Sequence, residues 1–397
     1  MKILVFTTLY PNAAHPNHGI FVENRVRHLI RNTGLDVQVV APVPWFPLRH
    51  PRFGRYADFA RVPAYEERHG IPVWHPRYPL LPKIGMTVAP ALLYAWSVRA
   101  LKRLRANGFD FDVIDAHYLY PDGVAGVMLA RRFGRPVVLT ARGNDVTLLP
   151  DYAGPRAWLR WAVKRADRVA AVAEALRKLC VERLAAPEEQ TLVLRNGVDL
   201  ETFTPDGPKA FEDLRNQSKR VILSVGALIE RKGHHLTIAA LQDLPADVVL
   251  AIAGDGPLRR QLADQAAEAG LGDRVVFLGA IPHQDLPAYY RGAELSVLAS
   301  SREGMANVLL ETLACGTRVV ATSVSGTPEV LQSPELGLLV HERSPRAITA
   351  ALQEELHRAS SPPHVAACVR HFGWYTTNQM QRKIFKQLAG SGTTSGT

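Results

Sequence analysis

Short apolar runs that read as strands alternate with helical patterns along the first half of the chain. The runs are KILVF, DVQVVAP, FDVIDAH, RPVVLTA, RVAAVA and TLVL, and a helical pattern covers residues 20–31 after the first of them. Strands that alternate with helices are joined by crossover connections, which make neighbouring strands parallel. This order predicts an α/β domain whose parallel sheet carries helices on both faces.

The same alternation restarts near residue 220. Its strand-like runs are RVILSVG, DVVLAIAG, RVVFLG, ELSVLAS and TRVVAT, and helical patterns begin after Gly233, at Pro257 and near Asn307. A chain of 397 residues has the length for two or three domains. We expect two Rossmann-like domains, residues 1–205 and 206–369, joined near residues 204–219. Ligands of such sheets bind outside the carboxyl ends of the strands, so the site is expected in the cleft between the domains.

Three segments depart from this alternation. Residues 42–85 are rich in Pro, aromatic residues and Arg, and a connection of that length is usually functional or mobile. Residues 370–388 read as a helix that offers Trp374 and Phe385 for packing. Residues 389–397 are expected to be disordered.

Positive charge is concentrated in the first half of the chain. Residues 1–205 contain 28 Lys and Arg against 18 Asp and Glu, whereas residues 206–397 contain 19 of each, so the formal net charge of +10 arises in the first half. Such asymmetry suggests that this half faces an anionic partner, whether nucleic acid, lipid headgroups or a phosphorylated substrate. The alternative is a basic surface without a partner.

Cysteine content and hydropathy indicate the compartment. Cys180, Cys315 and Cys368 are too few and too scattered for a disulfide framework or a zinc site, which suits a reducing cytoplasm. The N-terminal MKILVFTTLYP reads as a strand and not as a signal peptide, and the longest apolar stretch, residues 86–96, falls short of the ~20 residues that span a bilayer. We expect a cytoplasmic protein that is neither secreted nor integral to a membrane.

The segment SSREGMANVLLETLACG carries the sharpest set of polar groups. Glu303 is expected on a loop, and Glu311 about one turn into a helix that begins near Asn307, so the two carboxylates would meet different parts of one elongated ligand. Backbone N–H groups at the start of this helix could hold phosphate oxygens. Those groups belong to Gly304, Met305, Ala306 and Asn307. Alternatively, Glu311 is an ordinary exposed helical residue and Gly304 a turn residue.

Further motifs in the second domain follow in a recognisable order. SVGALIERKG places Arg231 and Lys232 after the first strand, AGDGP forms a strand–turn–helix junction, and SGTPEVL lies near another strand end. With EGMANVLLE, this order resembles the nucleotide-sugar domain of the family 4 glycosyltransferases. HGIFVENRVRHL and RNGVDLETFTP extend the resemblance over nearly the whole chain. TLYPNAAHPNHGIFVEN and TARGNDV are most similar to members that build bacterial exopolysaccharide or teichuronic-type polymers.

The resemblance implies the GT-B fold, in which two Rossmann-like domains face a central cleft and a C-terminal helix returns to the N-terminal domain. The first domain would receive the acceptor and the second the nucleotide-sugar. The implied enzyme is a retaining, metal-independent hexosyl- or glycosyltransferase without a cofactor. It would move a sugar from a UDP- or GDP-sugar to a glycan or polyprenyl-diphosphate-linked acceptor in surface polysaccharide synthesis. Its implied place is the inner face of the plasma membrane.

The resemblance also assigns roles to residues of the second domain. Glu303 would contact hydroxyls of the donor sugar, and Glu311 the ribose hydroxyls. Lys232, with Arg231, would hold the diphosphate and stabilise charge on the leaving nucleoside diphosphate. Many relatives carry an Arg where this chain has Ala227, so the clamp would depend on Arg231.

In the first domain the candidates lie at expected strand ends and helix starts. Gly19 lacks a Cβ and would let the backbone approach a phosphate. His117 ends the run FDVIDAH, where relatives often keep a His next to the sugar, although a His at a strand end is more often structural. Arg142 and Asp145 would occupy the same rim, and Asn196 would serve the hinge or the site.

Other functions are less well supported. Asp110 to Asp112, DFD, precedes a strand and is read as a turn, so no metal site is expected. GDGPLR lacks the third Gly of a dinucleotide fingerprint, which argues against a dehydrogenase. A non-catalytic, two-lobed sugar or nucleotide-sugar binding protein remains the alternative.

Aromatic and basic residues interleave in two segments of the first domain. Such a pattern is typical of a surface that attaches reversibly to anionic lipid, whereas no nucleic-acid-binding motif accompanies it. The alternative is that the aromatic residues pack in the core and the arginines are merely solvated. The insertion contributes Trp45, Phe46, Phe53, Tyr56 and Phe59 with Arg49, Arg52, Arg55 and Arg61, and residues 92–105 contribute Leu92, Leu93, Trp96, Leu101 and Leu104 with Arg99, Lys102, Arg103 and Arg105.

Overall fold

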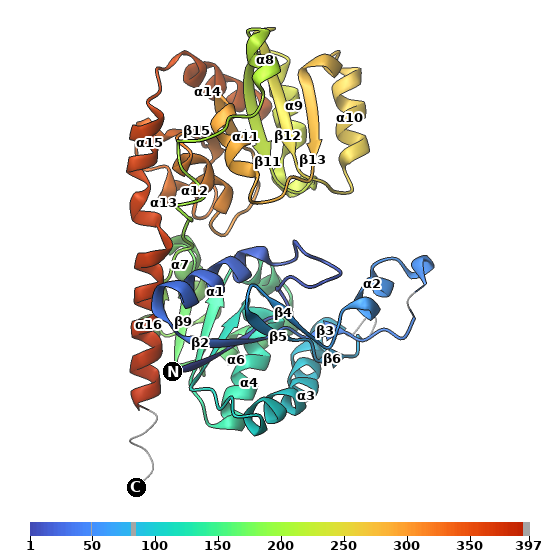
Figure 1. Cartoon of the computed structure of the whole chain (residues 1–397), viewed down its shortest axis with the longest axis vertical. Coiled ribbons are helices and arrows are strands. Elements are labelled where there is room, and N and C mark those ends of the chain that lie inside the picture. Colours follow the sequence, from blue (N-terminus) through green and yellow to red (C-terminus); the bar gives the residue numbers. More distant parts are fainter. Residues whose placement is uncertain (49, 81–84, 392–397) are drawn as a thin grey trace. The chain divides into compact units, whose positions relative to one another are not determined.

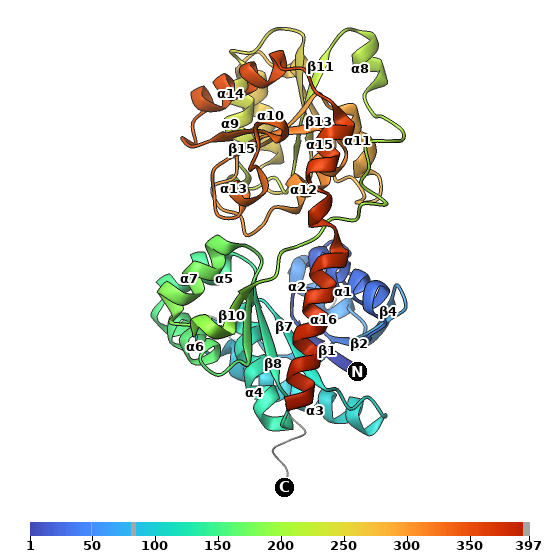
Figure 2. The same cartoon turned by 90° about the vertical axis from the view of Figure 1, so that its left-hand side faces the viewer.

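The computed structural model describes residues 1–48, 50–80 and 85–391, and divides into two compact units (Figures 1 and 2). Unit 1 contains residues 1–196 and the helix from Trp374 onward, and unit 2 contains Gly197–Gly373. The first boundary, 196/197, lies before the expected 205/206. The second, 373/374, lies after the expected 369/370. The Val198 N–H donates to the Phe372 carbonyl at 3.0 Å, and this contact keeps both ends of the segment within unit 2.

Unit 1 is built on an eight-stranded sheet with the order β10-β9-β8-β7-β1-β2-β5-β4. Neighbouring strands are parallel except for the antiparallel β4–β5 pair. Apolar, largely β-branched runs form the inner strands, as expected for a sheet covered on both faces. The strands are β1 Lys2–Phe6, β2 Asp36–Val40, β4 Tyr65–Arg68, β5 Ile71–Trp74, β7 Val113–His117, β8 Val137–Ala141, β9 Arg168–Ala171 and β10 Thr191–Val193.

Helices cover the unit 1 sheet on both faces (Figures 1 and 2). On one face, α1 (Ile20–Thr33) and α16 (Trp374–Ser391) pack on each other and on a core that includes Val26 and Phe385. On the other face, α3, α4 and α6 contact one another. The remaining bounds in this part of the unit are α3 Gly85–Ala106, α4 Val124–Phe133, α5 Asn144–Thr147, α6 Ala153–Val163, α7 Glu174–Leu184, the π-type turn η2 Leu119–Gly123, and the 3-10 turns η3 Leu149–Asp151 and η4 Glu188–Gln190.

The start of α1 requires glycine. Gly19 has a φ of 70°, and a Cβ on it would lie 2.3 Å from the carbonyl group of Leu9. The C-terminal helix is longer than expected, because α16 continues to Ser391. This corrects the expected disorder for residues 389–391, whereas residues 392–397 lie outside the described part of the chain.

The insertion at residues 42–85 is more ordered than its composition suggests. It contains the short parallel pair β3 (Val43–Pro44) and β6 (Arg77–Tyr78), the turn η1 (Pro51–Phe53), the helix α2 (Arg55–Arg61) and the β4–β5 hairpin. The expectation of one long loop is therefore wrong for the described part of the insertion. Residues 49 and 81–84 lie outside the described part.

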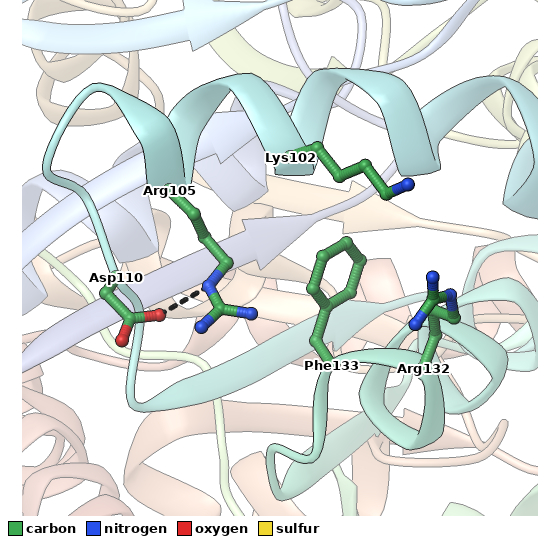
Figure 3. Close-up of a pocket in the computed structure, with 5 residues that line it drawn as sticks. All are labelled: Lys102, Arg105, Asp110, Arg132 and Phe133. Carbon is green, nitrogen blue, oxygen red and sulfur yellow. Dashed lines mark ion pairs between the residues drawn. The ribbon is translucent and has the colours of Figure 1, made fainter.

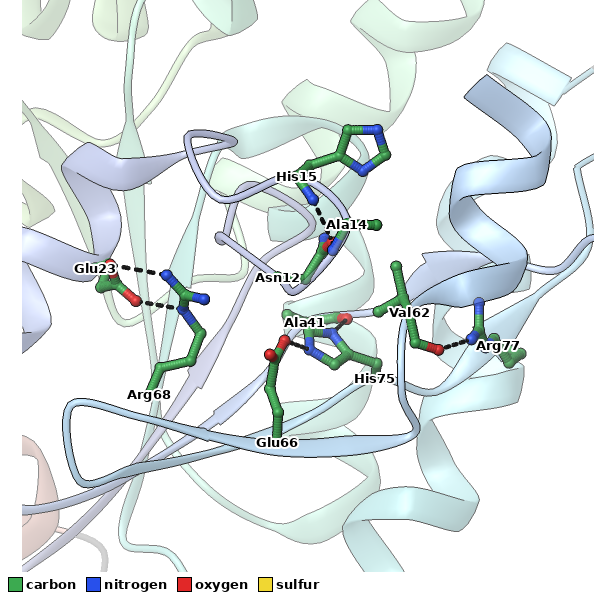
Figure 4. Close-up of polar contacts among 10 residues, drawn as sticks. All are labelled: Asn12, Ala14, His15, Glu23, Ala41, Val62, Glu66, Arg68, His75 and Arg77. Carbon is green, nitrogen blue, oxygen red and sulfur yellow. Dashed lines mark hydrogen bonds and ion pairs between the residues drawn. The ribbon is translucent and has the colours of Figure 1, made fainter. Parts of the chain in front are cut away.

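Polar contacts stabilise the insertion internally and attach it to the rest of unit 1 (Figure 4). Arg68 Nε donates to the buried carboxylate of Glu23 on α1 at 2.6 Å. The His75 ring lies 2.8 Å from both the Glu66 carboxylate and the Ala41 carbonyl. Arg77 donates to the Val62 carbonyl just after α2. These contacts join residues that are distant in sequence, which is why composition alone did not indicate an ordered segment.

Unit 2 has a six-stranded, all-parallel sheet with the order β13-β12-β11-β14-β15-β16. In chain order this is 3-2-1-4-5-6, the dinucleotide-fold arrangement whose switch point lies between the first and fourth strands, here β11 and β14. The sixth strand was not expected from the sequence. The bounds are β11 Arg220–Val225, β12 Val248–Ala253, β13 Val275–Gly279, β14 Leu295–Leu298, β15 Arg318–Thr322 and β16 Gly337–Val340.

The helices of unit 2 also lie on both faces of its sheet. Helices α9, α10 and α14 share one apolar core with the strands, while α12 contacts both α11 and α15. The bounds are α8 Glu212–Asn216, α9 His234–Leu241, α10 Arg259–Glu268, α11 Leu286–Gly292, α12 Asn307–Ala314, α13 Thr327–Val330, α14 Pro345–His357, α15 Pro362–Cys368, η5 Glu230–Lys232, η6 Gly272–Arg274, η7 Pro334–Leu336 and η8 Arg370–Phe372. Among the described residues of both units, none of the helices has the length and apolar character needed to cross a membrane.

Candidate active site

The switch point of unit 2 brings together three of the expected site residues. Lys232 follows β11 in η5, and Glu303 lies on the loop after β14. Lys232 Nζ is 2.7 Å from Glu303 Oε1, and Arg231 Nη1 is 3.4 Å from Glu303 Oε2. Glu303 is only 9% exposed. The strand order therefore assembles a buried, charged cluster where α/β sheets bind their ligands.

Backbone geometry fixes this cluster. Gly233 has a φ of 75°, and a Cβ there would lie 2.1 Å from the Ala299 carbonyl oxygen. The absence of a side chain lets the start of α9 lie against the end of β14. Two further bonds connect the loops, because the Ser301 N–H donates to the Arg231 carbonyl and Arg231 Nη1 donates to the Arg302 carbonyl, each at 2.8 Å.

Glu303 is held in its ionised form. Burial opposes ionisation, but Lys232, Arg231 and the Ser300 hydroxyl outweigh it and lower the pKa of the Glu303 carboxyl. The Ser300 hydroxyl donates to Glu303 Oε1 at 2.7 Å. Glu303 thus partly neutralises the positive charge of Lys232 and Arg231. These two residues in turn keep its carboxylate ionised.

Glu311 lies on α12 and forms a second polar cluster. It is 8% exposed, so the alternative of an ordinary exposed Glu is wrong. Its Oε1 is 2.8 Å from His283 Nε2, and its Oε2 accepts from the Tyr290 hydroxyl at 3.1 Å. Phe203 packs edge-on against the His283 ring at 5.1 Å. Sequence reasoning missed His283 and Tyr290, although an aromatic-rich PHQDLPAYY segment after β13 was a usable signal.

The segment Gly304–Asn307 connects the two carboxylates. Helix α12 begins at Asn307 after Ala306, whose side chain cannot cap it. The first N–H groups of a helix lack intrahelical partners, so this backbone suits an anion. Met305 and Ala306 are buried, and the Gly304 carbonyl accepts from the Gly326 N–H at 3.2 Å.

Unit 1 carries its own buried polar cluster at the carboxyl ends of β7 and β8. Arg142 Nη2 donates to His117 Nδ1 at 2.8 Å, and Arg142 Nη1 donates to Asn196 Oδ1 at 3.0 Å. Because a guanidinium can only donate, the neutral His117 ring carries its hydrogen on Nε2. That nitrogen lies 3.2 Å from Asp115 Oδ2. Burial lowers the pKa of His117 to about 4, with Arg142 adding to the effect and Asp115 opposing it, so the ring is neutral.

Two residues missed by sequence reasoning complete this cluster. Arg25 of α1 is fully buried and donates to Gln381 of α16 at 3.2 Å, and Gln381 donates to Asp115 at 2.8 Å. Burial lowers the pKa of Arg25 to about 10 and that of Arg142 to about 9, so both stay protonated near neutral pH. Within the described residues, Asp115 Oδ1 and Arg142 Nε are buried atoms without a hydrogen-bond partner. Atoms of this kind are usually satisfied by a ligand or by ordered water.

Asp145 connects loops of unit 1. It accepts backbone N–H bonds from Leu119 at 2.9 Å, Arg142 at 3.0 Å and Gly143 at 2.7 Å. Its side chain thereby fixes the backbone on which Arg142 stands. Gly19 lies at the start of α1, where its own backbone conformation already accounts for glycine.

A second buried carboxyl, that of Asp122, connects the loops on the two sides of the unit 1 switch point, which lies between β1 and β7. Asp122, after β7, accepts from the Thr8 N–H at 2.8 Å and from the Thr8 hydroxyl at 3.0 Å, and Thr8 follows β1. His18 contacts the Thr8 carbonyl at 3.1 Å. Burial raises the pKa of Asp122 to about 7, although the bonds from Thr8 oppose the rise.

Comparisons with known proteins agree with this geometry. Residues 18–202 match the family model described as Glycosyltransferase Family 4, and residues 208–366 match Glycosyl transferases group 1. A relative in Bacillus subtilis strain 168, TuaC, is provisionally named a teichuronic acid biosynthesis glycosyltransferase. It is 30% identical over 92% of this chain and 92% of its own length.

Solved structures show the same fold. Sucrose-phosphate synthase from Thermosynechococcus elongatus superposes with a TM-score of 0.77 at 22% identity, covering 98% of this chain and 99% of that protein. HepE from Anabaena, solved in complex with UDP, superposes with a TM-score of 0.72 at 22% identity, covering 98% of this chain and 100% of that protein. The expected GT-B fold is therefore confirmed.

Proposed function

The chain belongs to the family 4 glycosyltransferases, and from that premise we propose that it is a retaining enzyme that uses a nucleotide-sugar in surface polysaccharide synthesis. The acceptor is a glycan or a polyprenyl-diphosphate-linked glycan. Membership establishes glycosyl transfer, while the donor, stereochemistry and pathway are the proposal. TuaC, named for teichuronic acid biosynthesis, and HepE, solved with UDP, support the polymer and the nucleotide.

The observation that carries the proposal is the Lys232–Glu303 pair at the switch point of unit 2. Lys232, assisted by Arg231, stabilises the diphosphate that leaves, so the enzyme needs neither a metal nor another cofactor. Glu303 accepts hydrogen bonds from donor-sugar hydroxyls. Backbone N–H groups of residues 304–307 contact the diphosphate. Among the described residues, no cluster of His, Cys, Asp and Glu with the makeup of a metal site occurs.

Glu311 binds the ribose in this proposal. Its two oxygens already accept from protein donors, so the ribose hydroxyls share the carboxylate with His283 and Tyr290 or displace them. A buried acceptor discriminates strongly for a hydroxyl-bearing ligand. Experiment must identify the nucleobase of the donor, and UDP-sugars and GDP-sugars are the first donors to test.

In the reaction the bond from the donor C1 to the diphosphate oxygen breaks. A bond from C1 to the acceptor oxygen forms on the same face of the sugar. The acceptor hydroxyl passes its proton to the departing diphosphate oxygen, and the nucleoside diphosphate leaves with the electron pair of the broken bond. No side chain is assigned as a covalent nucleophile.

For unit 1 we assign His117 to the sugar-facing edge together with Arg142 and Asn196. The unpartnered Arg142 Nε and Asp115 Oδ1 are the atoms that a polar ligand would satisfy. Both are buried, so a sugar reaches them only if side chains of this cluster shift. Asp145 acts through the backbone of Arg142, and Gly19 admits a donor phosphate near the start of α1.

Donor screening tests the proposal. A nucleotide-sugar at 100 times its dissociation constant should stabilise the protein by about 2.7 kcal/mol in a thermal-shift assay. Mixing that donor with an acceptor glycan should then release nucleoside diphosphate. Stabilisation without release, across a panel of acceptors, would favour the alternative of a non-catalytic nucleotide-sugar binding protein.

We further propose that unit 1 attaches reversibly to anionic lipid at the cytoplasmic face of the plasma membrane. Trp45 and Trp96 are 56% and 47% exposed, and Arg99, Lys102, Arg103 and Arg105 of α3 are exposed. The structure corrects part of the expected surface, because Leu93, Leu101 and Leu104 lie in the core. Phe46 packs against Phe53 and Tyr56 within the insertion. Arg49 and the Arg55 side chain lie outside the described structure.

A further inference from the structure

A basic cavity lies between the ends of α3 and α4 in unit 1 (Figure 3). Its volume is about 430 Å³, within the range of small-molecule sites. It is lined by Lys102, Arg105, Asp110, Arg132 and Phe133. The roles assigned in the glycosyl transfer do not use this cavity.

The cavity is remote from the candidate active site. Its residues end α3 and α4 and precede β7 and β8, whereas His117 and Arg142 lie at the carboxyl ends of these strands. The two edges are separated by the four residue steps from Val113 to His117 along β7, which amounts to roughly 13 Å at about 3.3 Å per residue. A donor diphosphate at the carboxyl edge therefore cannot fill this cavity.

The charges of the cavity are not balanced. Both oxygens of its one carboxylate are used, because Asp110 pairs with Arg105 and with Arg135, each at 2.7 Å. Lys102 and Arg132 form no ion pair with any described residue, and both are exposed. In Figure 3 the Phe133 ring stands between the Arg105 guanidinium and these two cations. The Arg105 guanidinium lies 5.8 Å from the centre of that ring.

Helix ends offer a simpler reason for these cations. Lys and Arg in the last turn of a helix interact favourably with its negative end. That reason covers Arg103 and Arg131 equally, since they also end α3 and α4, yet neither lines the cavity. It does not account for two unpaired cations from different helices around one aromatic ring.

We propose that this cavity is a second anion site, which binds a phosphomonoester or diphosphate group through Lys102 and Arg132. The Arg132 guanidinium presents a planar fork that matches two phosphate oxygens, and the Lys102 ammonium adds a point charge. Phe133 supplies an apolar wall for the group that carries the phosphate. The phosphate comes either from a lipid headgroup or from a soluble metabolite.

The test uses the full chain with Lys232→Ala, which weakens diphosphate binding at the donor site. Calorimetric titration with inorganic pyrophosphate should show one remaining site. Adding Arg132→Gln should weaken that site about tenfold, the value of one hydrogen bond to a charged group. Arg131→Gln is the matched control, because it removes the same charge from the same helix turn and should leave the affinity unchanged.

Vesicles distinguish the two sources of phosphate. If the source is a headgroup, vesicles with phosphatidic acid should bind the Lys232→Ala chain, and Arg132→Gln should release more protein than Arg131→Gln. If the source is soluble, only the pyrophosphate titration should separate the two variants. Equal behaviour of Arg132→Gln and Arg131→Gln toward both probes would overturn the proposal. Neither outcome depends on glycosyl transfer.

Discussion

Glu303 and Glu311 belong to one short segment but have different surroundings. Glu303 accepts hydrogen bonds from the Lys232 ammonium and the Ser300 hydroxyl. Glu311 instead contacts the rings of a His and a Tyr through their polar atoms. Separate partners allow separate tasks on one ligand. In our account the first carboxylate serves the sugar and the second the ribose.

Substituting each carboxylate should therefore give different binding phenotypes. Glu311→Ala should weaken binding of the free nucleoside diphosphate by about 1 to 3 kcal/mol, because ribose hydroxyls lose a buried charged acceptor. Glu303→Ala should leave that affinity intact, since it frees Lys232 and Arg231 for the diphosphate, yet depress turnover. Calorimetry and initial rates measure both. Equal affinity losses for the bare nucleotide would contradict the assignment.

Gly233 offers a second test at the scale of one residue. Gly233→Ala should destabilise unit 2 by more than about 2 kcal/mol, because it adds a steric overlap to the cost of about 1 to 2 kcal/mol for a left-handed residue. Gly270 is the matched control, with a φ of 68° and no heavy atom within 4 Å of an added Cβ. Gly270→Ala should incur the conformational cost alone. Chemical denaturation measures the unfolding free energy of both variants. Equal losses of unfolding free energy would show that the backbone at Gly233 does not approach Ala299 closely.

At the scale of elements, much of the structure was predictable. The strands formed by KILVF, DVQVVAP and the later apolar runs were visible because buried parallel strands form short apolar runs, whereas β3 to β6 of the insertion were missed. β16 was missed because GLLV is brief and follows the turn residues of SPEL. Lys232 and Glu303 could be named from motifs at strand ends. Arg25, Gln381 and Asp122 could not, because each acquires its role from a partner far along the chain.

Asp122, which joins the loops after β1 and β7 through Thr8, should make stability depend on pH, because its burial raises the pKa of its carboxyl. The folded-state pKa of Asp122, about 7, lies above its ordinary value of 3.8, so the fold binds a proton that the unfolded chain releases. Stability should fall as pH rises from about 4 to about 7, and the contribution should be constant above that. Asp122→Asn should flatten the unfolding free energy across this range and be no less stable at pH 8. An unchanged slope would assign the pH dependence to other groups.

At the scale of the whole molecule, the excess of positive charge belongs to the first half of the chain and should act at a membrane. Vesicle binding should require anionic lipid and fall as salt rises, at about 1 kcal/mol for each Lys or Arg near the surface. Changing Arg99, Lys102, Arg103 and Arg105 to Ser should abolish most binding in a co-sedimentation assay. Binding that ignores lipid charge would refute membrane attachment through this surface.

The central claim is that unit 2 performs glycosyl transfer with Lys232 as the group that stabilises the leaving diphosphate. The most direct measurement is the rate of nucleoside diphosphate release by Lys232→Gln at saturating donor and acceptor. Arg260→Gln is the control, since that side chain is 96% exposed on α10 of the same unit. Loss of one preorganised charge stabiliser should lower kcat about 100-fold or more, with the control unchanged. A Lys232→Gln variant that turns over at the rate of the unaltered enzyme would contradict the account.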